Sequence, residues 1–344
     1  MVKFDNDYTR GAHPEILAAL ADTNLEQTSG YGTDPYCEEA KKIILEECNL
    51  PDGDVHFLVG GTQTNAVMID AMLLPTQGVM GAESAHINVH ESGAVEASGH
   101  KVIVLESYDG KLSAETIDDY MKRFYEDATW PHKVIPGMVY LSQPTELGTL
   151  YSLAELEAIS GVCRKWKIRL YIDGARLIYA LAAPGNDVSL RDMARLADAF
   201  YIGGTKAGAL FGEALVVARK SDYPYMFTLI KRHGALLAKG RLLGIQFLKL
   251  FSDGLYKRIG KNAIDMAMPI REAFLKKGWQ PASGSVTNQQ IFEIPDHVIK
   301  SLKEHVSFDL WGRVSETASL VRFTTDWSTT RQEIDTLLSL IQKV

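Results

Sequence analysis

Short apolar runs alternate along the chain with segments in which apolar residues recur at helical spacing. The runs typical of buried strands lie at residues 55–59, 78–81, 102–105, 138–141, 169–173 and 199–202. The helical segments between and after them lie at residues 15–21, 36–48, 67–74, 113–125, 153–165 and 225–251. Strands that alternate with helices form mostly parallel sheets covered on both faces. The pattern therefore predicts an α/β fold.

The pattern changes after residue 251. A helix is expected at residues 263–277 and short strands at 290–294 and 319–324, which is typical of a smaller α+β domain. The polar arm at residues 4–9 has too little apolar content to fold alone, so it must dock on the rest of the chain. We predict an N-terminal arm and first helix over residues 1–20, a large domain over 21–251 and a small domain over 252–344.

Composition narrows the class of function. The 344 residues carry a formal net charge of −7, which argues against nucleic acid and anionic membranes as partners. Three cysteines form no CxxC pair, and no uninterrupted apolar run is long enough to span a bilayer. His86 and His90 have the spacing of metal ligands on a helix, but no third ligand is evident, so we expect no metal site. We predict a cytoplasmic protein that acts on small molecules.

Lys206 is the clearest candidate for a chemically reactive residue. It lies in a turn of small residues, GGTKAG, between the apolar run at 199–202 and a second run that ends at Ala218. An ammonium group among apolar neighbours is costly to desolvate, so such a lysine tends to lose its proton and becomes an amine nucleophile that can form a Schiff base. A lysine at an exposed hairpin tip is the alternative interpretation.

Other polar residues follow predicted strands. Asp173 ends the run at 169–173, where ligands bind in open α/β sheets, and Arg176 follows as a possible ion-pair partner. Gly61 and Thr62 lie between a strand and a helix, where free backbone N–H groups can bind phosphate. We interpret His86, just beyond another strand, as a single functional imidazole.

Together these residues fit the requirements of pyridoxal phosphate chemistry. Lys206 would form the Schiff base, and Asp173 would keep the pyridine nitrogen protonated as an electron sink. The helix N-terminus would hold the phosphate, and His86 would cover the ring. Arg322, within the apolar run at 319–324, would hold the carboxylate of an amino-acid substrate.

The chain resembles the threonine aldolase and β-eliminating lyase family of fold type I pyridoxal-phosphate enzymes. The motifs that carry the resemblance are GYGTDP, GGTQTN, ESAHINVHESGA, IDGAR, GGTKAGALFG and LVRFT, which span nearly the whole chain. The resemblance implies that Lys206 carries the cofactor, that Asp173 binds its ring nitrogen and that His86 stacks on the ring. It places Gly61 and Thr62 on the phosphate, and Arg176 with Arg322 on the substrate carboxylate.

The resemblance also implies a homotetramer built as a dimer of dimers. The loop around Tyr31 and the basic segment at 231–241 would then reach a neighbour's site. Two departures from the family pattern change the site. Asn6 stands where the family has a serine near the substrate carboxylate, and SQPT at 142–145 lacks a second active-site histidine. We expect Gln143 to bind substrate in its place.

We therefore predict a lyase that cleaves L-threonine, L-allo-threonine or a related β-hydroxy-α-amino acid to glycine and an aldehyde. One alternative is a pyridoxal-phosphate-dependent β-eliminating lyase that gives a keto acid and ammonia, because both reactions use the same residue types. An alternative of another class is a non-enzymatic α/β scaffold that binds an anion or a partner, with Lys206 paired to a carboxylate.

Overall fold

The computed structural model describes residues 1–344 and is built around a mixed sheet of seven strands. The strands follow the order β2-β8-β7-β6-β5-β3-β4. All neighbours from β7 to β4 are parallel, whereas β8 runs antiparallel to both β7 and β2. Their bounds are β2 Asp54–Leu58, β3 Gln77–Ala82, β4 Val102–Leu105, β5 Ile135–Ser142, β6 Arg169–Asp173, β7 Ala199–Gly203 and β8 Glu213–Val217. The prediction of an α/β fold with a mostly parallel sheet is confirmed.

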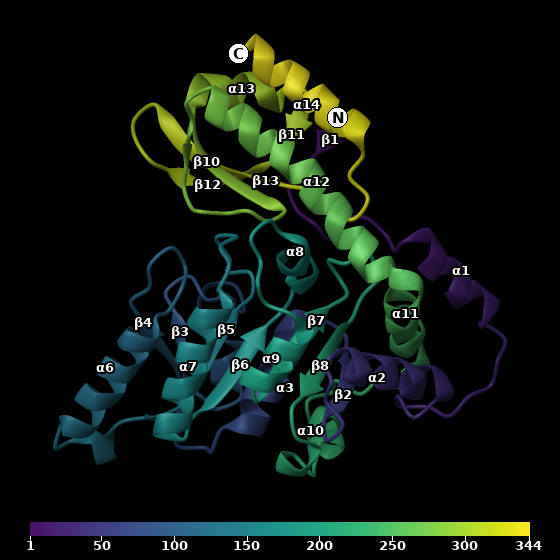
Figure 1. Ribbon diagram of the computed structural model, residues 1–344, viewed down its shortest axis with the longest axis vertical. Coiled ribbons are helices and arrows are strands. Elements are labelled where there is room, and N and C mark those ends of the chain that lie inside the picture. The colour runs from purple at the N-terminus through teal and green to yellow at the C-terminus, as the bar shows by residue number, and fades with distance from the viewer.

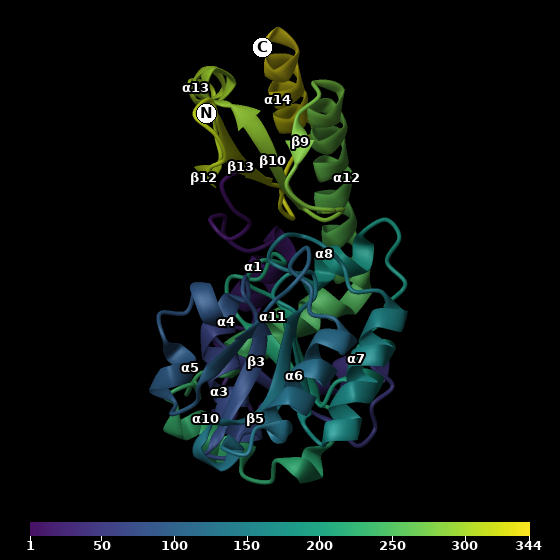
Figure 2. The ribbon, with the colours of Figure 1, turned by 90° about the vertical axis from the view of Figure 1, so that its left-hand side faces the viewer.

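Helices cover both faces of this sheet. Figure 2 shows α6 and α7 on one side of strands β3 and β5, with α3 and α5 on the other. The helices of this part of the chain are α1 Pro14–Asp22, α2 Pro35–Glu47, α3 Gly61–Met72, α4 His86–Val89, α5 Ala94–Ala97, α6 Ala114–Glu126, α7 Leu153–Trp166, α8 Leu177–Ala182, α9 Leu190–Leu196, α10 Met226–Arg232 and α11 Arg241–Phe251. None of the helices is both long and apolar enough to cross a bilayer.

A second, four-stranded antiparallel sheet lies in the C-terminal part of the chain. Its strands follow the order β12-β13-β10-β9, with bounds β9 Gln280–Pro281, β10 Gln289–Pro295, β12 Asp309–Arg313 and β13 Ala318–Thr324. Helices α12 Leu255–Lys276, α13 Asp296–Lys303 and α14 Arg331–Lys343 accompany it. Figure 1 shows these elements above the seven-stranded sheet, with α12 running from one part to the other.

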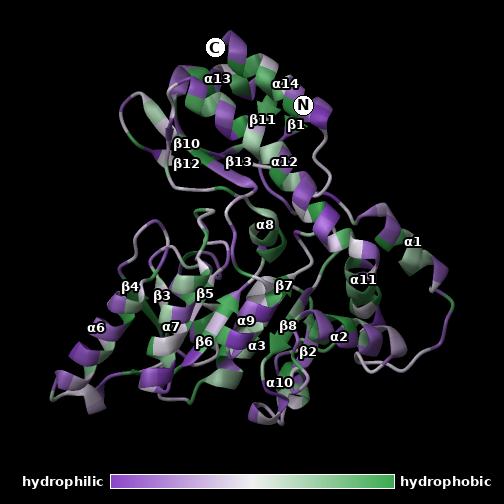
Figure 3. Ribbon diagram, in the orientation of Figure 1, coloured by the Kyte–Doolittle hydropathy of each residue, from purple (hydrophilic) through white to green (hydrophobic).

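Two hydrophobic cores hold the molecule together. One cluster of 66 buried residues surrounds the large sheet, and one of 16 lies between the small sheet and its helices. Helix α12 contributes Ile259 to the first and Phe274 to the second. Figure 3 shows the hydrophobic colour concentrated on the central strands, as burial of their apolar side chains requires.

The N-terminal arm docks on the C-terminal part of the chain, as its polar composition requires. Strand β1 (Val2–Lys3) pairs in parallel with β11 (Val306–Ser307). Phe4 is buried, and its backbone is hydrogen-bonded to Ser307 and Thr324. Both termini consequently lie in the upper part of Figure 1.

Some predicted elements need correction. The helix expected over 225–251 is two helices, α10 and α11, separated by residues 233–240 with Gly234 at φ 65°. A positive φ ends a helix readily at glycine, which has no Cβ. The helix expected at 263–277 begins earlier, at Leu255, and runs through Pro269. Pattern reading missed β9, β12, α13 and α14.

Candidate active site

Lys206 lies in the turn between β7 and β8, at the carboxyl edge of the parallel strands. The backbone N–H groups of Gly204 and Thr205 donate to Gly212 O at 2.9 and 3.0 Å, and Tyr179 Oη donates to Lys206 O at 2.6 Å. These bonds hold the lysine backbone in place. Burial and the charge of Arg176 lower the pKa of Lys206, which favours the uncharged amine.

Asp173 ends β6 and accepts hydrogen bonds from several groups. Tyr140 Oη and Tyr201 Oη each donate at 2.6 Å, Ala175 N at 3.0 Å and Asn65 Nδ2 at 3.1 Å. Burial by itself raises the pKa of Asp173, but the charge of His86 and the tyrosine hydroxyls outweigh it, so this pKa is lowered. The structure thus keeps a buried carboxylate anionic at the sheet edge.

Arg176 is not the partner of Asp173. Its Nε and Nη2 donate to the two carboxylate oxygens of Asp7 at 2.7 and 3.0 Å, and both side chains are buried. Asn288 Nδ2 adds a third donor to Asp7 at 3.0 Å. This bidentate pair joins the N-terminal arm to the loop after β6. Of the Arg176 nitrogens only Nη1 is left free of Asp7, and it lies 3.8 Å from Glu146 Oε2.

His86 begins α4, just beyond β3, and pairs with a buried carboxylate. Its Nδ1 lies 2.7 Å from Glu91 Oε1, which also accepts from Asn65 Nδ2 at 2.7 Å. Burial lowers the pKa of His86, but the hydrogen bond to Glu91 and the charges of Glu146 and Asp173 outweigh it, so this pKa is raised. The His90 ring centroid lies 5.6 Å from that of His86.

The start of α3 lies against the residues that bind Asp173. Gly60 has no capping side chain, so the first N–H groups of the helix have no partner within it. A Cβ on Gly61 would lie 2.9 Å from Tyr201 Oη, the same hydroxyl that binds Asp173. Thr62 is exposed, and its hydroxyl makes no hydrogen bond within the chain. The free donors at the start of this helix suit an anionic group.

Gln143 requires a correction. Its Nε2 donates to Tyr151 O at 3.1 Å and its Oε1 accepts from Tyr151 N at 2.9 Å, so both ends of the amide are engaged. The side chain is buried and not free to bind a substrate. Instead, Glu146 from the same loop faces the site. Its carboxylate is 15% exposed, makes no hydrogen bond, and its charge acts on His86, Lys206 and Arg176.

Arg322 reaches the same region from β13. Its Nη1 donates to Gln289 Oε1 at 3.0 Å, its Nη2 pairs with Asp309 and contacts Asp5 O, and its Nε is buried without a partner. Gln289 Nε2 in turn lies 3.5 Å from Glu146 O, which links the small sheet to the loop after β5. Arg322 is therefore neutralised within the chain but retains one unused donor.

Two other sequence-predicted residues lie at the margin. Asn6 directly precedes Asp7, and its Oδ1 accepts from Tyr8 N at 3.1 Å. Tyr31 is half-exposed, and its backbone has a φ of 61°. Lys231 Nζ lies 4.6 Å from the centroid of the Tyr31 ring, and the backbone N–H of Tyr31 donates to Ala238 O. The Tyr31 loop thus lies against the basic segment at 231–241, and its contacts within the chain do not include Lys206 or Asp173.

Sequence reasoning missed Asp7, Asn65, Glu91, Tyr140, Tyr201 and Glu146. The two tyrosines lie within apolar strands, where the sequence pattern predicts only core residues. Asn65 is the last residue of the GGTQTN motif, and Glu91 follows His86 by five residues. Their closeness in sequence to candidate residues is the signal that could have identified them. No group of three or more His, Cys, Asp or Glu side chains is arranged to hold a metal ion.

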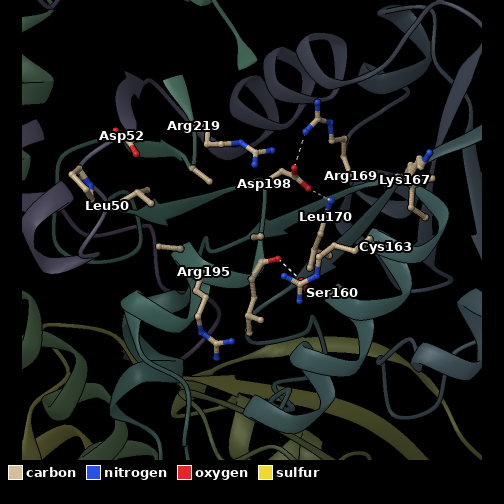
Figure 4. Close-up of a pocket in the computed structure, with 17 residues that line it drawn as sticks. Leu50, Asp52, Ser160, Cys163, Lys167, Arg169, Leu170, Arg195, Asp198 and Arg219 are labelled. Carbon is tan, nitrogen blue, oxygen red and sulfur yellow. Dashed lines mark hydrogen bonds and ion pairs between the residues drawn. The ribbon is translucent and has the colours of Figure 1, made fainter. Parts of the chain in front are cut away.

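A separate cleft lies at the opposite, amino edge of the parallel strands. This cavity of about 650 Å³ is rich in cations, among them Lys167, Arg169, Arg195 and Arg219. Figure 4 shows Asp198 between Arg169 and Arg219, and Arg169 Nη1 donates to Asp198 Oδ1 at 2.8 Å. Arg195 pairs with Glu157, and Arg219 pairs with Asp222. These cations are largely neutralised, and none of the candidate site residues lines the cleft.

Comparison with known proteins agrees with this geometry. A family model described as beta-eliminating lyase matches residues 5–302. The low specificity L-threonine aldolase of Pseudomonas aeruginosa is 31% identical over 267 residues, which cover 76% of this chain and 75% of that protein. The solved threonine aldolase of Leishmania major is 39% identical, with a TM-score of 0.96 over 100% of this chain and 99% of that one.

More distant structures share the fold alone. Aspartate aminotransferase of Thermus thermophilus is 14% identical, with a TM-score of 0.72 over 100% of this chain and 91% of that one. The family model covers well over half of the chain, and the Pseudomonas relative matches across three quarters of it. The chain therefore belongs to the beta-eliminating lyase family and has the fold type I architecture of pyridoxal-phosphate-dependent enzymes.

Proposed function

We propose that this chain is a pyridoxal-phosphate-dependent lyase that cleaves L-threonine, L-allo-threonine or a related β-hydroxy-α-amino acid to glycine and an aldehyde. The observation that carries the proposal is the surroundings of Asp173. A buried carboxylate, kept anionic by four donors, shares its site with a lysine whose pKa is lowered. The names of the Pseudomonas and Leishmania relatives support the same reaction.

The residues present fit the cofactor. Lys206 would hold it covalently, Asp173 would bind its ring nitrogen and His86 would cover its ring. Gly61 and Thr62, at the uncapped start of α3, would hold the phosphate. When bound, pyridoxal phosphate supplies an electron sink for the pair left on Cα as the Cα–Cβ bond breaks.

The chain's own residues account for the rest of the chemistry. Nη1 of Arg176 and the guanidinium group of Arg322 hold the substrate carboxylate, assisted by Asn6 from the docked arm. His86 takes the proton of the β-hydroxyl group, directly or through a water, which contributes about 10²- to 10⁴-fold. The aldehyde then leaves. Lys206, which the substrate's amino group has displaced, would return a proton to Cα, and glycine leaves.

We further propose that the chain works as a homotetramer, a dimer of dimers, in the cytoplasm. The loop of Tyr31 and the segment at 231–241 would contribute to a neighbour's site, because within one chain they contact each other and not Lys206. We divide the chain into an arm with the first helix (1–20), a large cofactor-binding domain (21–251) and a small domain (252–344).

Product analysis tests the proposed reaction. The protein loaded with pyridoxal phosphate is incubated with L-threonine, L-allo-threonine and phenylserine, with Lys206→Ala as the matched control. Glycine plus the corresponding aldehyde, absent from the control, is the expected result. A keto acid with ammonia would assign β-elimination, and a protein that takes up no pyridoxal phosphate would favour a non-enzymatic scaffold.

A further inference from the structure

Glu91 is a buried carboxylate to which the proposed function gives no task. It is 5% exposed and lies in the turn after α4. Its Oε1 contacts His86 Nδ1 and accepts from Asn65 Nδ2, both at 2.7 Å, while its Oε2 is buried without a partner. A buried charge with one oxygen unpartnered is costly, so a purely structural role explains it poorly.

Asn65 fixes which groups donate in this cluster. Its Oδ1 accepts from Tyr171 Oη at 3.0 Å, so its Nδ2 is the donor that faces Glu91 at 2.7 Å and Asp173 at 3.1 Å. One amide group therefore bridges the two carboxylates. With its acceptor used by Tyr171 and its donors used by Glu91 and Asp173, Asn65 can satisfy this arrangement in one orientation only.

The contact with Glu91 determines the state of His86. A carboxylate accepts hydrogen bonds but does not donate them, so Nδ1 of His86 must carry a hydrogen. In the neutral ring the lone pair then lies on Nε2, which makes no hydrogen bond within the chain. The His86 side chain is 26% exposed, so the ring is held at one nitrogen and accessible at the other.

We propose that Glu91 is a positioning residue that holds His86 with Nε2 directed at the substrate's β-hydroxyl group. This inference rests on the proposed function, in which His86 takes the hydroxyl proton. The charged groups that face His86 are Glu91, Glu146 and Asp173, and the His90 ring lies beside it. Only Glu91 contacts Nδ1, so only Glu91 can select the tautomer.

Glu91→Gln separates this role from simple packing. A glutamine whose oxygen takes the Oε1 position still accepts from His86 and Asn65, but it carries no charge and its NH₂ group is buried without a partner at the Oε2 position. The flipped amide donates to Nδ1 and moves the ring hydrogen to Nε2. Either arrangement weakens the base. The loss of a negative charge also lowers the pKa of His86, so the acidic limb of the pH profile of kcat/KM moves to lower pH.

The experiment compares two activities of the loaded enzyme. We expect Glu91→Gln to lower kcat for threonine cleavage by about 10²-fold, the lower end of the general-base range. Exchange of the glycine α-proton in D₂O, which needs Lys206 but no hydroxyl base, should stay within about 3-fold of wild type. Glu96→Gln, which removes an exposed carboxylate five residues away, is the matched control and should change neither activity.

The outcomes are distinguishable. An equal loss of cleavage and exchange would overturn the inference by making Glu91 structural, and so would an unchanged pH profile. Absence of both activities in the wild type would instead overturn the proposed function. If Glu91→Gln does not fold, ¹⁵N NMR of the wild-type histidines decides the matter. The neutral His86 ring should carry its hydrogen on Nδ1, and hydrogen on Nε2 would refute the proposal.

Discussion

The pair between Asp7 and Arg176 should control how firmly the N-terminal arm is docked. The two residues are only 1% and 6% exposed, and they share two hydrogen bonds of 2.7 and 3.0 Å. Burial raises the pKa of Asp7, but the charge of Arg176 outweighs it and the pKa is lowered, so the pair is ionised at neutral pH. Asp7→Asn removes the charge while retaining one acceptor.

The size of the effect follows from burial. Breaking a buried ion pair from one side costs about 3–5 kcal/mol, because the remaining charge is left uncompensated. At about 1.4 kcal/mol per factor of ten, the arm should open about 10²- to 4 × 10³-fold more often. Asn6 belongs to the arm, so KM for threonine should rise as well.

Hydrogen–deuterium exchange of peptides covering residues 1–12 measures this opening directly. Asp5→Asn is the matched control on the same arm, because Asp5 is only partly buried and accepts one side-chain hydrogen bond, from Ser307. Its cost should be about 1 kcal/mol, hence an effect of roughly 5-fold. Equal protection in Asp7→Asn and wild type would show that the pair does not hold the arm.

Three further predictions concern the site. Lys206→Ala should abolish turnover and the visible absorbance of bound pyridoxal phosphate; retention of either would contradict the role of this lysine. Asp173→Asn keeps the shape but loses the charge and one of the two oxygens that accept from Tyr140 and Tyr201, so kcat should fall by at least about 10²-fold, measured by glycine release. Burial raises the pKa of Glu213 to about 8, so the folded state favours the neutral carboxyl group. The protonated group therefore contributes stability at low pH, and this contribution is lost as the pH rises from about 4.5 to 8. The melting temperature of Glu213→Gln minus that of wild type should therefore increase between pH 6 and pH 9. A difference that does not change with pH would refute this.

Much of the candidate site could be predicted from the sequence pattern because the polar residues that follow apolar runs mark the ends of strands. Lys206, Asp173 and His86 each follow an apolar run, and the carboxyl ends of parallel strands meet at one edge of a sheet. The uncapped start of α3 could be predicted in the same way, because a glycine pair lies between a strand and a helical segment. These features depend on residues within a few positions of one another.

What the sequence determined by itself was the alternation of strands and helices, the edge of the sheet that carries the polar residues, and the residue types available for chemistry. Only the tertiary structure decided the partners. Arg176 could have paired with nearby Asp173 but binds Asp7, 169 positions away, and Asp173 takes Asn65, 108 positions away. The same reason applies to Gln143, whose amide is engaged by Tyr151. A buried polar group must be satisfied by whichever donor or acceptor the folded chain brings within about 3 Å, and that proximity is a property of the packed structure, not of local sequence.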